Sequence, residues 1–191
     1  MSSDLDAFRR LASAEVLDEY ALNTAAGLLA EDSAALAELV AEYAASDRKE
    51  LQVAPLFPLM KCWYTDGDPN DFAPSAIKYI ELAGGSDGQG LLTGALSTLE
   101  AMISTDRTLL PPDRYQLVAN FTYRCLRYPH LVVQASAVEF LSTLAELDLL
   151  DGVASASDDA DLLREGLRSF FSETGSDFAV EAEHLADFLR S

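Results

Sequence analysis

An apolar pattern that returns about every 40 residues constrains the fold of this chain more than any other feature. Its three segments are 51–62, 91–102 and 133–144, and their starting positions lie 40 and 42 residues apart. This spacing is close to the ~40–47-residue period of stacked two-helix repeats. A single two-helix unit cannot bury its apolar face, so such units stack and leave an extended surface exposed. The pattern therefore predicts binding rather than catalysis.

Helical periodicity continues through nearly the whole chain, and no segment shows the alternation typical of a strand. The sequence therefore predicts an all-α protein. The expected helices cover residues 4–11, 14–29, 33–46, 54–64, 74–82, 91–103, 114–128, 131–147, 161–171 and 177–189.

Several helix boundaries follow from local signals. We expect Ser13 to cap the second helix and Asp71 to cap the helix that carries Pro74, since short polar side chains accept hydrogen bonds from the first free N–H groups. His130 is expected as a cap or turn residue. Pro55 should lie in the first turn of its helix, which bends near Pro58. Residues 152–157, GVASAS, form the most linker-like stretch.

The segment 133–144, VQASAVEFLSTL, resembles the second helix of a HEAT-type repeat, which reads V-R-x-x-A-x-x-A-L-x-x-L. Gln134 replaces the arginine of that pattern, and Phe140 replaces a small alanine. The resemblance to the HEAT and armadillo group is clearest over residues 113–147. It implies stacked antiparallel helical hairpins (an α-solenoid) and a protein-binding or scaffold role without an active site. A globular helical bundle is the alternative arrangement.

At 191 residues, the chain has the length of one domain or one short solenoid. We expect a single all-helical domain over 1–191, in which the acid-rich residues 158–191 form capping helices with a polar outer face. Cys62 and Cys125 lie in apolar helical stretches, where a cysteine usually behaves as a small buried hydrophobe. Whether the two pair is left open, and no oligomeric state is predicted.

The chain is strongly acidic, with 32 acidic against 13 basic residues and a net charge of −19. This balance argues against a nucleic-acid partner, because phosphate neutralisation requires clustered Lys and Arg. It fits either adaptation to a high-salt cytoplasm or electrostatic steering toward a basic protein. No run of about 18 apolar residues is present, and the chain opens on acidic residues, so we expect a cytoplasmic protein that does not enter a membrane.

No catalytic motif is evident, and we expect neither a metal nor a cofactor. Asp66, Asp68 and Asn70 match the first three ligand positions of a calcium loop. However, Asp71 stands at the sixth position, which requires glycine, and Ile77 at the twelfth, which requires a bidentate glutamate. This segment is therefore interpreted as a solvated turn.

The same turn places aromatic residues next to carboxylates, a combination that suits a binding hot spot for a basic protein. The candidate partner-binding residues are Trp63, Tyr64, Asp66, Asp68, Asp71 and Phe72. The alternative interpretation is that Trp63 and Phe72 pack in the core.

These observations predict a non-enzymatic protein-binding module with an acidic helical surface. Its most concrete form is an immunity or antitoxin-type protein that neutralises a basic toxin. The alternative is a haloarchaeal scaffold or adaptor whose acidity reflects a high-salt cytoplasm.

Overall fold

The computed structural model describes residues 3–14, 18–44, 46–85 and 87–156, together with Gly166 and Leu185. Within these residues every regular element is helical, which confirms the predicted all-α class. No described helix is both long and apolar enough to span a bilayer. The chain divides into two compact units, Met1–Leu109 and Leu110–Ser191.

The described helices of the first unit are α1 (Ser3–Ala12), α2 (Glu19–Leu29), α3 (Ser33–Ala44), α4 (Lys49–Gln52), α5 (Leu56–Leu59), the 3₁₀ turn η1 (Cys62–Tyr64), α6 (Pro69–Ala83), α7 (Gln89–Thr105) and the 3₁₀ turn η2 (Arg107–Leu109). Those of the second unit are the 3₁₀ turn η3 (Pro112–Arg114), α8 (Tyr115–Leu126), α9 (Leu131–Glu146) and α10 (Leu150–Ala156).

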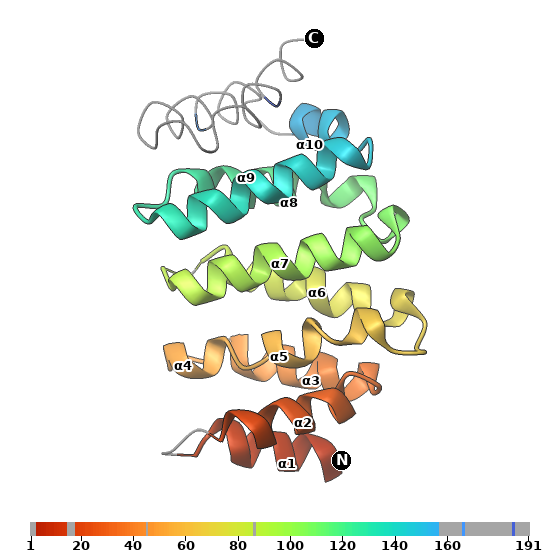
Figure 1. Cartoon of the computed structure of the whole chain (residues 1–191), viewed down its shortest axis with the longest axis vertical. Coiled ribbons are helices and arrows are strands. Elements are labelled where there is room, and N and C mark those ends of the chain that lie inside the picture. The colour runs from red at the N-terminus through yellow and green to blue at the C-terminus, as the bar shows by residue number, and fades with distance from the viewer. Residues whose placement is uncertain are drawn as a thin grey trace. The chain divides into compact units, whose positions relative to one another are not determined.

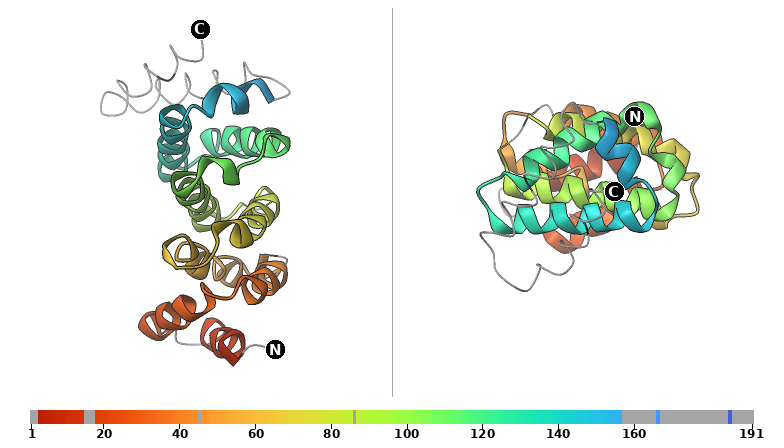
Figure 2. Two further views of the ribbon diagram at one scale, coloured as in Figure 1. Left: turned by 90° about the vertical axis from the view of Figure 1, so that its right-hand side faces the viewer. Right: turned by 90° about the horizontal axis from the view of Figure 1, so that it is seen from above.

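In the first unit, α3 packs against α6 and α6 against α7, while α5 contacts both α2 and α7. Figure 1 shows α2, α5 and α7 on the near side, with α3 and α6 behind them. The view turned by 90° separates the same helices into two columns (Figure 2). The core lies between these columns, because each helix turns its apolar stripe toward the other column.

Helix α7 illustrates how the predicted stripe becomes core. Residues three and four apart lie on one side of a helix, and this spacing brings one whole apolar face inward. The buried members are Leu91, Leu92, Ala95, Leu96, Leu99, Met102 and Ile103. The prediction of a helix over 91–103 is confirmed.

The start of α2 differs from the prediction. Asp18 caps this helix by accepting a hydrogen bond from the N–H of Ala21 at 3.0 Å. Ser13 instead lies in the turn that follows α1. The prediction that Ser13 caps a helix beginning at Ala14 is therefore wrong.

The segment 54–64, predicted as one helix, is broken into shorter pieces. Within it, α5 covers only Leu56–Leu59 and η1 covers Cys62–Tyr64, while α4 ends at Gln52, before the segment begins. Pro55 and Pro58 cause the break, because proline has no N–H to donate and its ring clashes with the preceding turn. The hydroxyl of Tyr79 in α6 donates a hydrogen bond of 2.7 Å to the carbonyl oxygen of Gln52, at the end of α4.

Helix α6 begins five residues before the predicted first turn. Its cap is Asp68, whose carboxylate accepts a hydrogen bond from the N–H of Asn70 at 2.9 Å. Asp71 lies in the first turn of α6, so the prediction that Asp71 is the cap is wrong. Pro74 lies inside α6.

In the second unit, α8 packs against α9 and α10. The prediction of a linker at 152–157 is wrong over its described part, since α10 continues to Ala156 and buries Val153 and Ala154. Gly152 marks a close contact instead: a β-carbon there would lie 2.7 Å from the Tyr115 ring. Apart from Gly166 and Leu185, the predicted capping helices at 158–191 lie outside the described residues.

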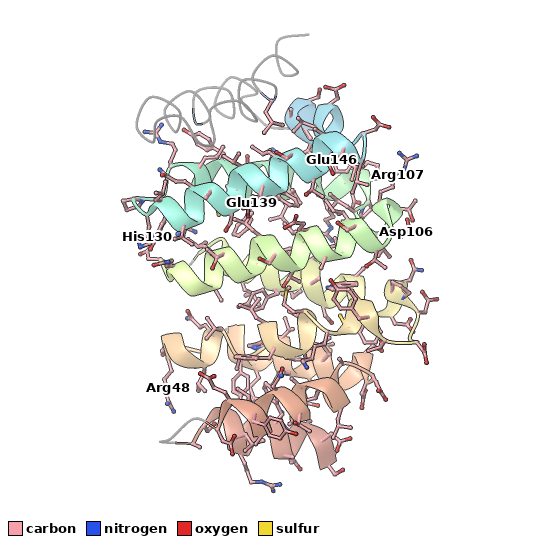
Figure 3. All side chains as sticks on the ribbon, viewed as in Figure 1. Arg48, Asp106, Arg107, His130, Glu139 and Glu146 are labelled. Atoms are coloured by element: carbon pink, nitrogen blue, oxygen red, sulfur yellow. The ribbon has the colours of Figure 1, made fainter. Side chains whose placement is uncertain are left out.

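His130 caps α9 as predicted, because its Nδ1 accepts a hydrogen bond from the N–H of Val132 at 3.4 Å. Figure 3 shows His130 at the start of this helix and Glu146 at its end. Cys62 and Cys125 are both buried free thiols, one in each unit.

Candidate partner-binding face

The predicted aromatic and acidic turn is divided between core and surface. Trp63 and Phe72 are 6% and 2% exposed, so both rings pack in the core of the first unit. Tyr64 is 81% exposed, and Asp66, Asp68 and Asp71 are also on the surface. The structure thus brings one aromatic ring, not three, to the surface beside the carboxylates.

Local packing explains why Phe72 is covered. A β-carbon on Gly67 would lie 2.8 Å from the Phe72 ring, so glycine lets the turn fold directly over this side chain. Trp63 is buried although its indole Nε1 has no hydrogen-bond partner among the described residues. Both aromatic rings therefore stabilise the base of the turn and are unavailable for a partner.

Asp68 has a structural role in the same turn. Its Oδ1 accepts hydrogen bonds from the backbone N–H of Asn70 and from the Asn70 side-chain amide, at 2.9 and 2.8 Å. These hydrogen bonds, the backbone one first, lower the pKa of the Asp68 carboxyl. Within the described ranges, no group of three or more His, Cys, Asp or Glu side chains is placed to hold a metal ion.

A second surface feature lies where the helix at 54–64 is broken. An open groove of about 480 Å³ runs between α2, the α4–α5 segment and α7. Its lining residues are Asn23, Val53, Leu56, Phe57, Met60, Lys61 and Gly90. The four apolar side chains of the broken segment are half-buried, because a four-residue helix that follows Pro55 and contains Pro58 covers less of its neighbours than a continuous helix would.

Three of the helices around this groove carry very little charge, whereas the short helix α4 has the sequence KELQ. Helices α2, α5 and α7 contain 11, 4 and 17 residues, and Glu19 and Glu100 are the only Asp, Glu, Lys or Arg residues among them. The whole chain is 24% charged. We call the exposed side of α2, α5 and α7, including the groove, the groove face; it is the near side of this unit in Figure 1.

The groove face continues along α2. Tyr20, Asn23 and Gly27 follow one another at intervals of three and four residues, so they share one side of the helix. Tyr20 is 84% exposed. A β-carbon on Gly27 would meet nothing within 4 Å. This side of α2 is therefore open to a partner.

One cation lines the groove. Lys61 is half-buried, and its ammonium group forms no ion pair with any described side chain. By contrast, Lys78 pairs with Glu81 at 2.9 Å. A lysine at an apolar surface that has no ion pair with the described part of the chain is notable in a protein with 32 acidic residues.

Two carboxylates of α3 lie outside the groove face and form ion pairs with α1. Arg9 of α1 contacts Glu38 and Glu42 at 2.6 Å each, and these hydrogen bonds raise its pKa further above the usual range. The first unit thus separates two kinds of surface, an ion-paired one on α1 and α3 and a charge-poor apolar one on the groove face.

Sequence reasoning did not identify the groove face. Two signals were available: the two prolines within an apolar repeat segment, and the scarcity of charge in residues 19–29 and 89–105. Neither signal shows that the three segments share one face, because that depends on tertiary packing.

Comparison with protein-family models, characterised proteins and solved structures finds no match to this chain.

Proposed function

We propose that the chain is a non-enzymatic protein-binding module, built of stacked helical hairpins, that docks its partner on the groove face. The observation that carries this proposal is the apolar groove, with its charge-poor surroundings, in a protein of net charge −19. Interface centres are depleted in charged residues and enriched in aromatic residues and methionine. Phe57, Met60 and Tyr20 provide these residue types on the groove face.

The acidic surface outside the groove face has a different role in this proposal. Carboxylates distributed around an apolar site attract a basic protein and accelerate its encounter, while the apolar contacts supply most of the affinity. The partner is therefore a protein with net positive charge. In its most concrete form, the module is a cytoplasmic immunity-type protein that neutralises a basic toxin.

A matched pair of charge substitutions tests which surface binds. Met60→Glu places a carboxylate in the groove, and Tyr64→Glu places one on the exposed acidic turn. The tagged wild-type protein and both variants are used to capture partners from a lysate of the source organism, with mass spectrometry as the readout. We expect Met60→Glu to lose a basic partner that Tyr64→Glu retains. Loss with Tyr64→Glu alone would assign binding to the turn and contradict the groove face.

Salt dependence separates steering from affinity. The association rate with the captured partner should fall steeply between 0.05 and about 0.5 M salt, because screening shortens the reach of the carboxylates. The dissociation rate should change much less, since the apolar contacts are not screened. An association rate that does not depend on salt would show that the surface carboxylates do not steer the partner.

The second candidate, a scaffold or adaptor of a high-salt cytoplasm, is favoured by the scarcity of lysine, with three in the whole chain. Its distinguishing property is folding that requires salt, because unscreened carboxylates repel one another. Circular dichroism from 0 to about 3 M KCl tests this. Loss of helicity below about 1 M KCl supports the scaffold, and constant helicity supports the immunity-type protein.

A further inference from the structure

We propose that the groove receives an amphipathic helix of the partner, and that this helix presents a carboxylate to Lys61. The inference rests on the proposed function and specifies the chemistry of its partner. The partner is basic as a whole, but the segment that enters the groove is apolar and carries one acidic side chain.

The shape of the groove face favours a helix. The groove opens onto the side of α2 that carries Tyr20, Asn23 and Gly27, and these residues span about 10 Å along that helix at 1.5 Å per residue. An amphipathic helix repeats its anchoring side chains at i, i+3 or i+4, and i+7, which covers a similar length. A helix can therefore place one anchor in the groove and another against Tyr20.

The ammonium group of Lys61 favours an acidic residue on the partner helix. Lys61 contributes mainly its aliphatic chain to a groove surface that is almost wholly apolar, together with apolar side chains, a glycine and Asn23. Covering its ammonium group with a purely apolar partner would desolvate an unpaired charge, which is costly. A partner lysine or arginine at this place would add repulsion. A carboxylate satisfies the ammonium group with a charge-assisted hydrogen bond.

The net charge of the chain indicates which kind of molecule carries this carboxylate. A free small carboxylate is repelled by a protein of net charge −19, and only its local contacts with Lys61 and the groove offset this repulsion. A carboxylate carried on a basic protein is attracted together with its carrier. The occupant is therefore a segment of a protein and not a free fatty acid or similar small anion.

Three synthetic peptides test the inference. Each is an 18-residue alanine-based helix with leucines at peptide positions 4, 8, 11 and 15 and lysines on the opposite side. They differ only at peptide position 12, which lies beside the leucine stripe, one turn after the leucine at position 8, and carries Glu, Gln or Lys. Titration into the ¹⁵N-labelled full chain, monitored at the amides of Lys61 and Gly90, gives each dissociation constant.

We expect wild-type affinity to decrease in the order Glu, Gln, Lys, with the Glu peptide at least about fivefold tighter than the Gln peptide. Lys61→Gln should make the Glu and Gln peptides bind equally, and Lys61→Glu should reverse the order. Lys61 is half-buried and makes no described ion pair, so both variants should fold, which a thermal melt confirms. Gly90→Leu, which fills the groove, should weaken all three peptides.

The outcomes separate this inference from the proposed function. If the peptides shift the groove amides but their order is the same in wild type and both Lys61 variants, the carboxylate pairing is overturned while the groove face stands. If dodecanoate shifts the groove amides as strongly as the Glu peptide, the site binds free small anions and the choice of a protein segment is overturned. If no peptide shifts these amides at millimolar concentration, docking of a helix is overturned, and with it the groove face as the binding surface.

Discussion

The side chain of Leu56 in α5 lies over Gly94 in α7, in the space that a β-carbon at position 94 would occupy. Glycine at this point lets the short helix α5 approach the backbone of α7 closely. The contact matters for the groove face because Leu56 also lines the groove. The position of this one side chain therefore couples the stability of the first unit to the shape of the groove.

Gly94→Ala should destabilise the protein, although alanine is the better helix former by about 1 kcal/mol. The new methyl group displaces Leu56, and overpacking of this kind costs about 1–3 kcal/mol. Adding Leu56→Ala should remove much of that cost, so the two substitutions should not be additive in urea denaturation. Gly27→Ala is the control: with nothing near its β-carbon, it should stabilise α2 by about 0.5–1 kcal/mol. Equal effects of Gly94→Ala and Gly27→Ala would show that Leu56 does not occupy this space.

Tyr79→Phe should destabilise the first unit by about 1–2 kcal/mol. The Tyr79 ring is fully buried, and its hydroxyl donates the hydrogen bond to the Gln52 carbonyl at the end of α4. Phenylalanine keeps the apolar packing of the ring but removes this hydrogen bond to the half-buried end of α4. Chemical denaturation measures the loss. Unchanged stability would mean that water or another donor replaces the hydroxyl.

The same hydrogen bond shows why only part of the fold was predictable. Residues 91–103 form the expected helix because every signal is local: one apolar stripe and no breaker. The end of α4 at Gln52 could not be predicted from local signals, because Tyr79, whose hydroxyl donates to the Gln52 carbonyl, lies 27 residues further on. Gly152 was interpreted as a linker residue because its close neighbour, Tyr115, is distant in the chain.

The candidate site, too, could be predicted only in part from the sequence. Trp63 and Phe72 are adjacent in sequence to exposed acids, yet tertiary packing covers both rings. Composition correctly indicated an acidic protein, but the distribution of charge depends on which helices share a side. The low charge of α2, α5 and α7 becomes informative only when these helices are seen around one groove.

Stability should decrease at alkaline pH because of the two cysteines. Burial raises the pKa of the Cys62 and Cys125 thiols to about 12. In the unfolded chain both thiols lose their protons at lower pH, so between about pH 9 and 12 the unfolded state binds fewer protons than the folded state. The free energy of unfolding then falls as pH rises, by at most about 1.4 kcal/mol per pH unit for each thiol. Burial also raises the pKa of Tyr79, which acts in the same direction above about pH 10.

Denaturation at several pH values between 7 and 11 measures this slope. The double variant Cys62→Ala/Cys125→Ala should show a shallower decline above pH 9, whatever its stability at pH 7. The native thiols should also react slowly with a disulfide reagent at pH 8 and rapidly after denaturation. Fast reaction of the native protein would contradict the burial of these side chains.

Arg9→Gln should cost about 1 kcal/mol at low salt, because it removes the contacts of α1 with Glu38 and Glu42 on α3. These carboxylates are about half exposed, so the effect should shrink in 1 M NaCl as screening increases. Arg10→Gln changes the net charge equally, and Arg10 is exposed on the same helix. It should have little effect at either salt concentration. Equal losses for the two variants would show that net charge, rather than this contact, matters.

The end of α9 offers a site for stabilisation. Asp148 has a φ of 58°, in the left-handed region, and it follows the last turn of the helix. The N–H groups of Asp148 and Leu149 donate to the carbonyl oxygens of Ala145 and Leu144 at 3.2 and 2.8 Å, which is the hydrogen-bond pattern of a Schellman motif. Glycine adopts this backbone conformation without the cost that a β-carbon imposes. Asp148→Gly should therefore stabilise the second unit by about 0.5–1 kcal/mol.

Two further variants at position 148 separate backbone conformation from charge. Asp148→Asn removes the carboxylate but keeps a side chain that tolerates the left-handed region, so it should stay close to wild type. Asp148→Ala keeps the β-carbon without that tolerance and should be less stable than the wild type. Thermal unfolding midpoints should thus decrease from Gly through Asn and Asp to Ala. If the Asn and Gly variants gained equally over wild type, the gain would come from removing a negative charge next to Glu146, and not from the backbone conformation.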